Sequence, residues 1–188
     1  MMDFLISICL GIGLAAAAGF RVFLPLLALS CASYFNSFDL AENWLWLGSL
    51  QTLIILGVAS VLELLAYYIP LFDNLLDTLA VPLATVAGAV LFFVSMGDSQ
   101  PWVIWSLALI GGGGTAGLVA GSTAAVRAVS STTTLGFANP LFSTFENGIS
   151  IFLSILSIFI PVVAGIVVVY IIYRSIKWLK SRKLKTKI

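Results

Sequence analysis

The chain has 188 residues, of which 61% are hydrophobic and only 9% are charged, and its formal net charge is +1. Soluble domains carry about 25% charged residues, so this composition excludes a soluble protein and predicts a polytopic membrane protein. At roughly 20 residues for each span, 188 residues accommodate one bundle of transmembrane helices but no additional soluble domain.

Five apolar stretches predict an all-α fold, a transmembrane helical bundle that forms a single domain over residues 1–173. The expected spans lie at about 4–29, 45–68, 74–96, 102–127 and 149–173. The first stretch lacks a basic segment before it, so we expect a retained helix and not a cleaved signal peptide. Within it, Pro25 predicts that the helix kinks or ends just after Arg21.

The basic residues are concentrated at one end of the sequence. Seven of the nine Lys and Arg residues fall in residues 174–188. The positive-inside rule therefore predicts a basic cytoplasmic tail over 174–188, in a protein of the cell (inner) membrane. A short basic tail beside a span contacts the headgroups of membrane lipids, and we do not expect it to bind nucleic acid.

Residues 128–146 combine polar side chains with apolar flanks, and they include Thr133, Asn139 and Glu146. This segment is too polar to cross lipid and too apolar for an ordinary loop. Irregular backbone at membrane depth is tolerated where protein or water satisfies its polar groups, so we predict a re-entrant or cavity-lining segment. A sixth crossing hidden in these residues is the alternative.

Ionisable residues inside apolar segments are the candidate functional residues. Exposing such a charge to lipid costs roughly 2.5–3.5 kcal/mol, so these side chains are expected to face the interior of the bundle. Counting crossings places Glu63, Asp77, Arg127 and Glu146 in the outer half of the membrane. Arg21 falls in the inner half, where only a sixth crossing would supply it with an acidic partner.

A carboxylate pair lies at the start of the third expected span. Asp73 and Asp77 are one helical turn apart on one face, where the partial positive charge of a helix N-terminus stabilises carboxylates. Helix capping is the simpler interpretation for Asp73. Asp77 lies a turn further in and remains a candidate for the polar interior.

Gly113, Gly117 and Gly121 lie four residues apart and therefore share one helix face. Small residues at this spacing let a neighbouring backbone approach closely in a bilayer, so this face is expected to pack another helix. The partner helix belongs either to the same chain or to a second copy in a homo-oligomer.

An internal repeat is also indicated. When the sequence around Arg21 is aligned with that around Arg127, Gly11 aligns with Gly117 and Ala15 with Gly121 without a gap. With two spans between them, the two arginine helices would run in opposite directions, which is the inverted-repeat pattern of many secondary transporters.

Several motifs together resemble the domain of unknown function 4126 family of small multi-pass membrane proteins. They are AAAGFRVFLPLLAL, E-x-x-AYYIP-x-x-DN-x-x-D, and R-x-x-SS followed by G-x-x-NP-x-x-S-x-x-E. The resemblance implies a shared membrane fold and no particular reaction. Members of the family often carry a histidine and a lysine before the second arginine, whereas this chain has Ser122 to Ala125 there and no histidine anywhere.

The residue inventory narrows the classes of function. With no histidine, no Cys-x-x-Cys motif and two separated cysteines, we expect neither a metal nor another cofactor. No nucleophile and base stand in a recognisable arrangement, so we do not expect an enzyme. The expected function is a transporter or channel for a small ion or solute, with intramembrane charges lining a polar path. The alternative is a non-catalytic scaffold or assembly protein whose charges form buried structural pairs.

Overall fold

The computed structural model describes residues 2–97, 101–134 and 138–185; side chains at 70–75, 77, 101, 175–176 and 178–185 are outside this description. The described residues form helices joined by short connections, without a strand among them. In chain order the elements are α1 (Met2–Phe20), α2 (Phe23–Tyr34), the 3₁₀ helix η1 (Glu42–Gly48), α3 (Leu50–Ala66), α4 (Pro70–Ser95), α5 (Pro101–Leu107), the π-helix η2 (Ala108–Gly113), α6 (Gly114–Thr134), α7 (Asn139–Phe159) and α8 (Pro161–Lys185).

The helices are long and apolar enough for a membrane. Within the described residues, four have the length and hydropathy of a span, and a fifth is obtained when η1 and α3, bent by 58°, are counted as one. The protein is therefore an all-α integral membrane protein with four to five candidate spans. Five spans agree with the number expected from the sequence, although the helix boundaries differ.

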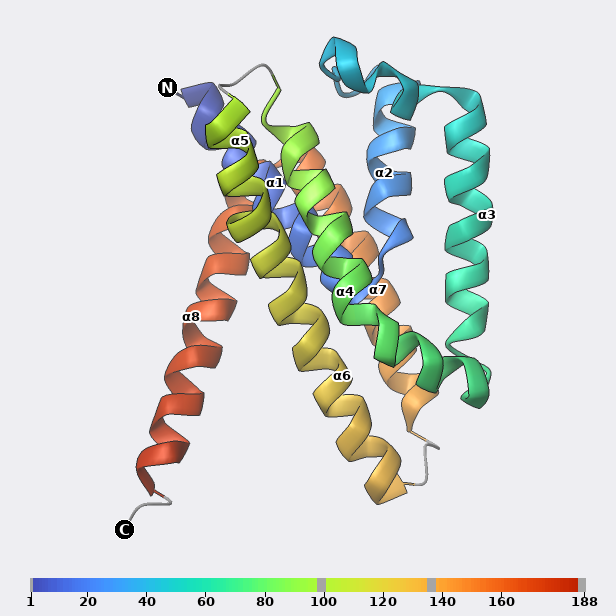
Figure 1. Ribbon diagram of the computed structural model, residues 1–188, viewed down its shortest axis with the longest axis vertical. Coiled ribbons are helices and arrows are strands. Elements are labelled where there is room, and N and C mark those ends of the chain that lie inside the picture. The colour runs from blue at the N-terminus through green and yellow to red at the C-terminus, as the bar shows by residue number, and fades with distance from the viewer. Residues whose placement is uncertain (1, 98–100, 135–137, 186–188) are drawn as a thin grey trace.

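The first predicted span, 4–29, is two helices that form a hairpin. α1 runs from the N-terminus to about the middle of the molecule, and α2 returns from there to the same end (Figure 1). The break falls at Arg21 and Val22, directly after the end of α1 at Phe20. Pro25 lies in the first turn of α2, where backbone N–H groups have no acceptor within the helix, so the missing N–H group of proline costs no hydrogen bond. The helix thus ends beside the arginine, as the proline predicted.

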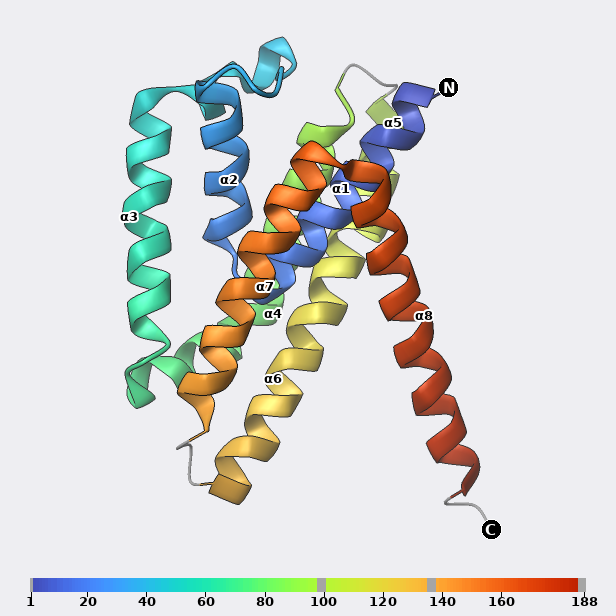
Figure 2. The same ribbon diagram turned by 180° about the vertical axis from the view of Figure 1, so that it is seen from behind.

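The remaining helices alternate in direction between the two ends of the molecule. α3 runs away from the N-terminal end, α4 returns, α5 to α6 runs away again, α7 returns and α8 ends at the opposite side (Figures 1 and 2). The two termini therefore lie at opposite ends. Because α2 adds one reversal, α1 and α6 run in the same direction, and the opposite directions expected of an inverted repeat are not observed for the two arginine helices.

The described part of residues 128–146, where a re-entrant or cavity-lining segment is expected, consists of the end of one helix and the start of the next. α6 continues to Thr134 and α7 begins at Asn139, with residues 135–137 outside the description. The hydroxyl of Thr133 donates to the carbonyl of Val129 at 2.9 Å, and that of Thr134 to Ser130 at 2.8 Å. A Ser or Thr hydroxyl that donates to the carbonyl one turn earlier has its hydrogen bond within the helix. These polar side chains are therefore compatible with regular helix.

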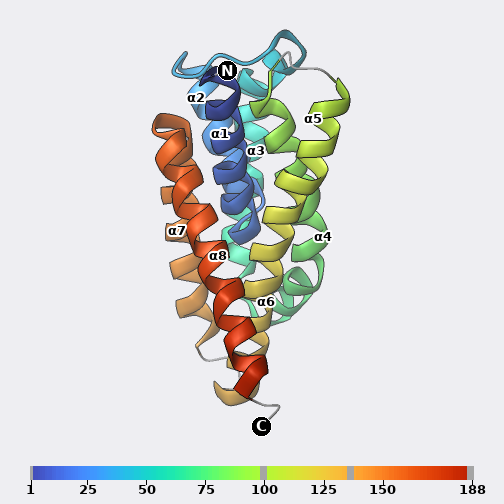
Figure 3. The same cartoon turned by 90° about the vertical axis from the view of Figure 1, so that its left-hand side faces the viewer.

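The last predicted span, 149–173, is likewise divided. α7 ends at Phe159, and α8 begins at Pro161 and runs back beside it at an angle (Figure 3). The proline cannot donate to a carbonyl of α7, so a continuous helix through this point would lose a hydrogen bond. The chain thus reverses direction at the α1–α2 hairpin, and α7 and α8 are separate elements (Figure 1).

Small residues bring α1, α4 and α6 close together at the centre of the bundle. A Cβ atom built on Gly112 would lie 2.5 Å from the carbonyl oxygen of Gly88, and one built on Gly19 would lie 2.7 Å from that of Ala116. Backbones approach this closely only where side chains are absent, as in small-residue packing in membranes. The core of the bundle is consequently closely packed around α1.

The glycine face singled out in the sequence is largely used within the chain. Gly113 and Gly117 both lie against Thr85 of α4, with built Cβ atoms 3.2 and 2.7 Å from its side chain. A Cβ at Gly121 would have no neighbour within 4 Å. Two of the three glycines therefore serve the contacts of η2 and α6 with α4.

Candidate functional site

The tip of the α1–α2 hairpin carries a buried arginine. Arg21 is 2% exposed, and the end of α1 leaves the carbonyl of Phe20 free to accept from its Nη1 at 2.8 Å. The guanidinium also donates to Glu146 Oε2 at 3.0 Å and to the Ser143 carbonyl at 3.2 Å, and its Nε donates to Asn147 Oδ1. The hairpin tip is thereby fixed to one face of α7.

A second buried arginine reaches the same carboxylate from α6. Arg127 is 1% exposed, and its Nε and Nη2 donate to the two oxygens of Glu146, the former at 3.2 Å. Its Nη2 also donates to the Ser143 hydroxyl at 3.0 Å. This two-point geometry is the strong form of an arginine–carboxylate pair. Glu146 is therefore shared between α1 and α6, the two helices that carry the arginines.

An aromatic ring covers both guanidinium groups. The central guanidinium carbon lies 3.9 Å from the centroid of the Tyr67 ring for Arg21 and 4.4 Å for Arg127. A cation within about 6 Å of a ring centroid is attracted by the negative face of the ring, most strongly where water is excluded. We call Arg21, Tyr67, Arg127 and Glu146 the charge network.

The other buried carboxylate belongs to α3 and caps α2. Glu63 accepts from the backbone N–H groups of Val22 at 2.8 Å and Phe23 at 3.0 Å. The first N–H groups of a helix have no partner within it, and the helix dipole favours negative charge at that end. Glu63 thus holds the start of α2, one residue away from Arg21. With Glu63 the site contains two formal positive and two formal negative charges.

The two remaining uncharged candidates lie outside the charge network. Thr133 is exposed, with its hydroxyl bonded within α6. Asn139 is buried at the start of α7, and its Nδ2 donates to the Ser131 hydroxyl at 3.0 Å, which links the end of α6 to α7. Asp73 and Asp77 lie in the first two turns of α4, and their side chains are outside the description.

Three contributors were not singled out in the sequence as site residues: Tyr67, Ser143 and Asn147. Tyr67 lies one helical turn after Glu63, a spacing that places both on one face of α3. Ser143 precedes Glu146 by three residues, a spacing that places both on one face of α7. Spacing from an intramembrane carboxylate is the signal that identifies both residues.

Comparison with known proteins supports the resemblance seen in the motifs. The family described as "Domain of unknown function (DUF4126)" matches residues 8–180, which is nearly the whole chain. The chain belongs to this family. No curated protein and no solved structure matches it. The part that matches DUF4126 includes every residue of the charge network and the capping Glu63.

Proposed function

We propose that the protein transports a small ion or polar solute across the membrane, with the charge network as its binding site. The observation that carries this proposal is that Glu146 is shared by two arginines at the tip of a broken-helix hairpin. Secondary transporters commonly build their sites from discontinuous helices that meet inside the membrane. Ionisable groups in that position are costly to bury, which favours a functional role for them.

The chemistry of the network favours an anion as the solute. A small anion would accept hydrogen bonds from one guanidinium group in place of Glu146. Glu146 would then keep its two-point contact with the other arginine. A cation would instead have to compete with two guanidinium groups for one carboxylate. Loss of the bond to Glu146 would leave the hairpin tip held to α7 only by the bonds from Arg21 to Ser143 and Asn147, which links binding of the anion to a loosening of α1 and α2.

The proposed orientation places the C-terminus in the cytoplasm, because residues 174–188 carry seven basic side chains. The N-terminus and the open end of the α1–α2 hairpin then face the opposite side. The loops at that end would meet the solute first if transport is inward.

Purified protein in liposomes tests the proposal. We expect chloride, nitrate or formate to pass faster than in empty liposomes, and Arg21→Lys to lower this flux by about tenfold or more. Lysine keeps the charge at residue 21 but loses the planar fork that reaches Phe20, Ser143 and Glu146, and tenfold corresponds to about 1.4 kcal/mol. Arg174→Lys makes the same substitution at an exposed arginine of α8 and should leave the flux unchanged.

One observation favours a second candidate, a non-catalytic scaffold with a structural charge network. Both oxygens of Glu146 accept from guanidinium groups, and both oxygens of Glu63 accept from backbone N–H groups. Carboxylates whose oxygens all have hydrogen-bond partners are typical of buried ion pairs that specify one arrangement of helices. Folded protein that passes none of the anions and no monovalent cation would support the scaffold and refute the transport proposal.

A further inference from the structure

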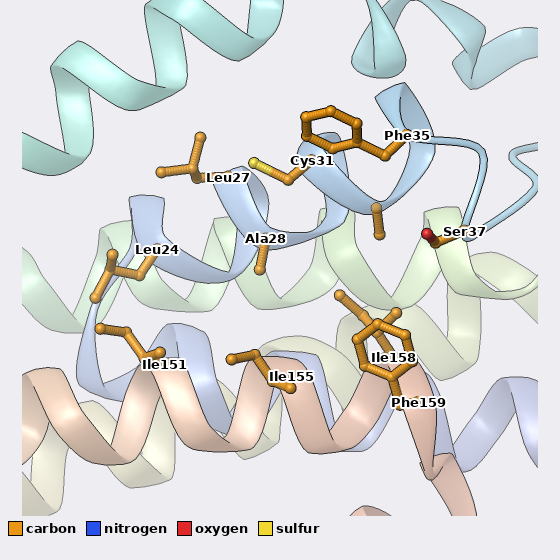
Figure 4. Close-up of a pocket in the computed structure, with 11 residues that line it drawn as sticks. Leu24, Leu27, Ala28, Cys31, Phe35, Ser37, Ile151, Ile155, Ile158 and Phe159 are labelled. Carbon is orange, nitrogen blue, oxygen red and sulfur yellow. The ribbon is translucent and has the colours of Figure 1, made fainter.

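An apolar groove runs lengthwise between α2 and α7. It has a volume of about 460 Å³, and its walls are side chains of the two helices that lie side by side (Figure 4). Leu24, Ala28 and Cys31 line it from α2, and Ile151 and Ile155 line it from α7. None of these residues belongs to the charge network.

The groove has the length of one leaflet of a bilayer. Its lining on α2 extends from Leu24 to Phe35, which is about 16 Å at 1.5 Å per residue. The hydrocarbon core of a membrane is about 30 Å thick, so this length is close to half of it. The groove begins near the hairpin tip, because α2 begins at Phe23, about halfway between the ends of the molecule (Figure 1).

We propose that this groove binds one acyl chain of a phospholipid from the leaflet at the N-terminal end of the protein. The site does not depend on the transport proposal. An acyl chain matches both the length and the apolar lining, and it gains contacts from two helices at once instead of from one. A transmembrane helix of a second copy fits less well, because it is 10–12 Å wide with its side chains and the groove holds only about 460 Å³.

A chain in the groove would end beside the site described above. Leu24 lies three residues after Arg21, and Ile151 lies four residues, or about one turn, after Asn147. The acyl chain therefore fills the space between α2 and α7 directly above the bonds from Arg21 to Glu146 and Asn147. Through its contacts with both helices, the acyl chain supports the hairpin against α7.

Native mass spectrometry of the full-length protein, released from mild detergent with dipalmitoyl phosphatidylcholine added, tests the groove. We expect wild-type protein to retain one lipid, and Ala28→Phe, which fills the groove, to bind it about tenfold more weakly. Val58→Phe adds a ring on the exposed side of α3 and should bind as wild type does. Equal retention by Ala28→Phe and Val58→Phe, or no retained lipid in folded wild-type protein, would overturn the proposal.

A second measurement covers the case in which Ala28→Phe does not fold. In a Cys9→Ala protein, Cys31 is the remaining thiol and lies in the groove. Added dipalmitoyl phosphatidylcholine should slow alkylation of Cys31 by N-ethylmaleimide, because the acyl chain covers it. A rate that does not change with lipid would contradict an occupied groove.

Discussion

Removing the charge of Glu146 should destabilise the fold more than removing either arginine. Glu146→Gln leaves two guanidinium groups, 2% and 1% exposed, without the carboxylate that they share. Breaking a buried ion pair on one side costs about 3–5 kcal/mol, a large part of the usual 5–15 kcal/mol of stability. Arg21→Met leaves the two-point pair of Arg127 and Glu146 intact. Its cost is that of the lost charged hydrogen bonds, about 1.5–3 kcal/mol.

Unfolding in a series of detergent mixtures, followed by tryptophan fluorescence and circular dichroism, measures this difference. We expect Glu146→Gln to unfold first, Arg21→Met second and wild type last. The double variant should cost less than the sum of the two single variants, because they share one interaction. If Arg21→Met destabilises as much as Glu146→Gln, the carboxylate does not hold both arginines and the network as described is refuted.

Two further predictions concern single contacts. Glu63→Gln should weaken the cap of α2 by about 0.5–2 kcal/mol and speed hydrogen exchange in its first turn, whereas Glu42→Gln, at an exposed carboxylate of η1, should not. Gly112→Ala should lower thermal stability by about 1–3 kcal/mol, because its Cβ would meet the carbonyl of Gly88. Gly114→Ala, with nothing within 4 Å, should be neutral or stabilising, and equal melting temperatures for the two alanine variants would contradict this packing.

The class of fold could be predicted from the sequence because the features that determine it are local. Apolar composition, the length of the hydrophobic stretches and Pro25 each act within a few turns, and they predicted the helical membrane bundle and the end of α1 beside Arg21. The motifs also identified the family correctly. The polarity of residues 128–146 led to the expectation of a re-entrant or cavity-lining segment. Their hydroxyls bond back to the preceding turn, and that local preference does not show in composition.

The partners of Arg21 could not be obtained from the sequence because they depend on the path of the chain. Treating 4–29 as one span placed Arg21 in the opposite half from Glu63, Arg127 and Glu146. In the structure α2 turns back at Val22, so the arginine stays at the hairpin tip and reaches Glu146, 125 residues away in the chain. One local reversal therefore changes the partners of a charge and also the relative direction of α1 and α6.

The same reversal explains why the charges are concentrated at one place. A hairpin whose tip is buried within the protein leaves free carbonyls at the end of α1 and free N–H groups at the start of α2, and buried backbone groups of this kind require partners. Arg21 satisfies the carbonyl of Phe20, and Glu63 satisfies the N–H groups of Val22 and Phe23. Neutralising Arg21 then requires Glu146. Glu63 is thus explained by helix termination alone, and Arg127 balances its charge, so that the four groups together carry no net charge. An anion that replaced Glu146 as the partner of one guanidinium would carry the same sign of charge as that carboxylate, and this is the argument for an anion as the solute.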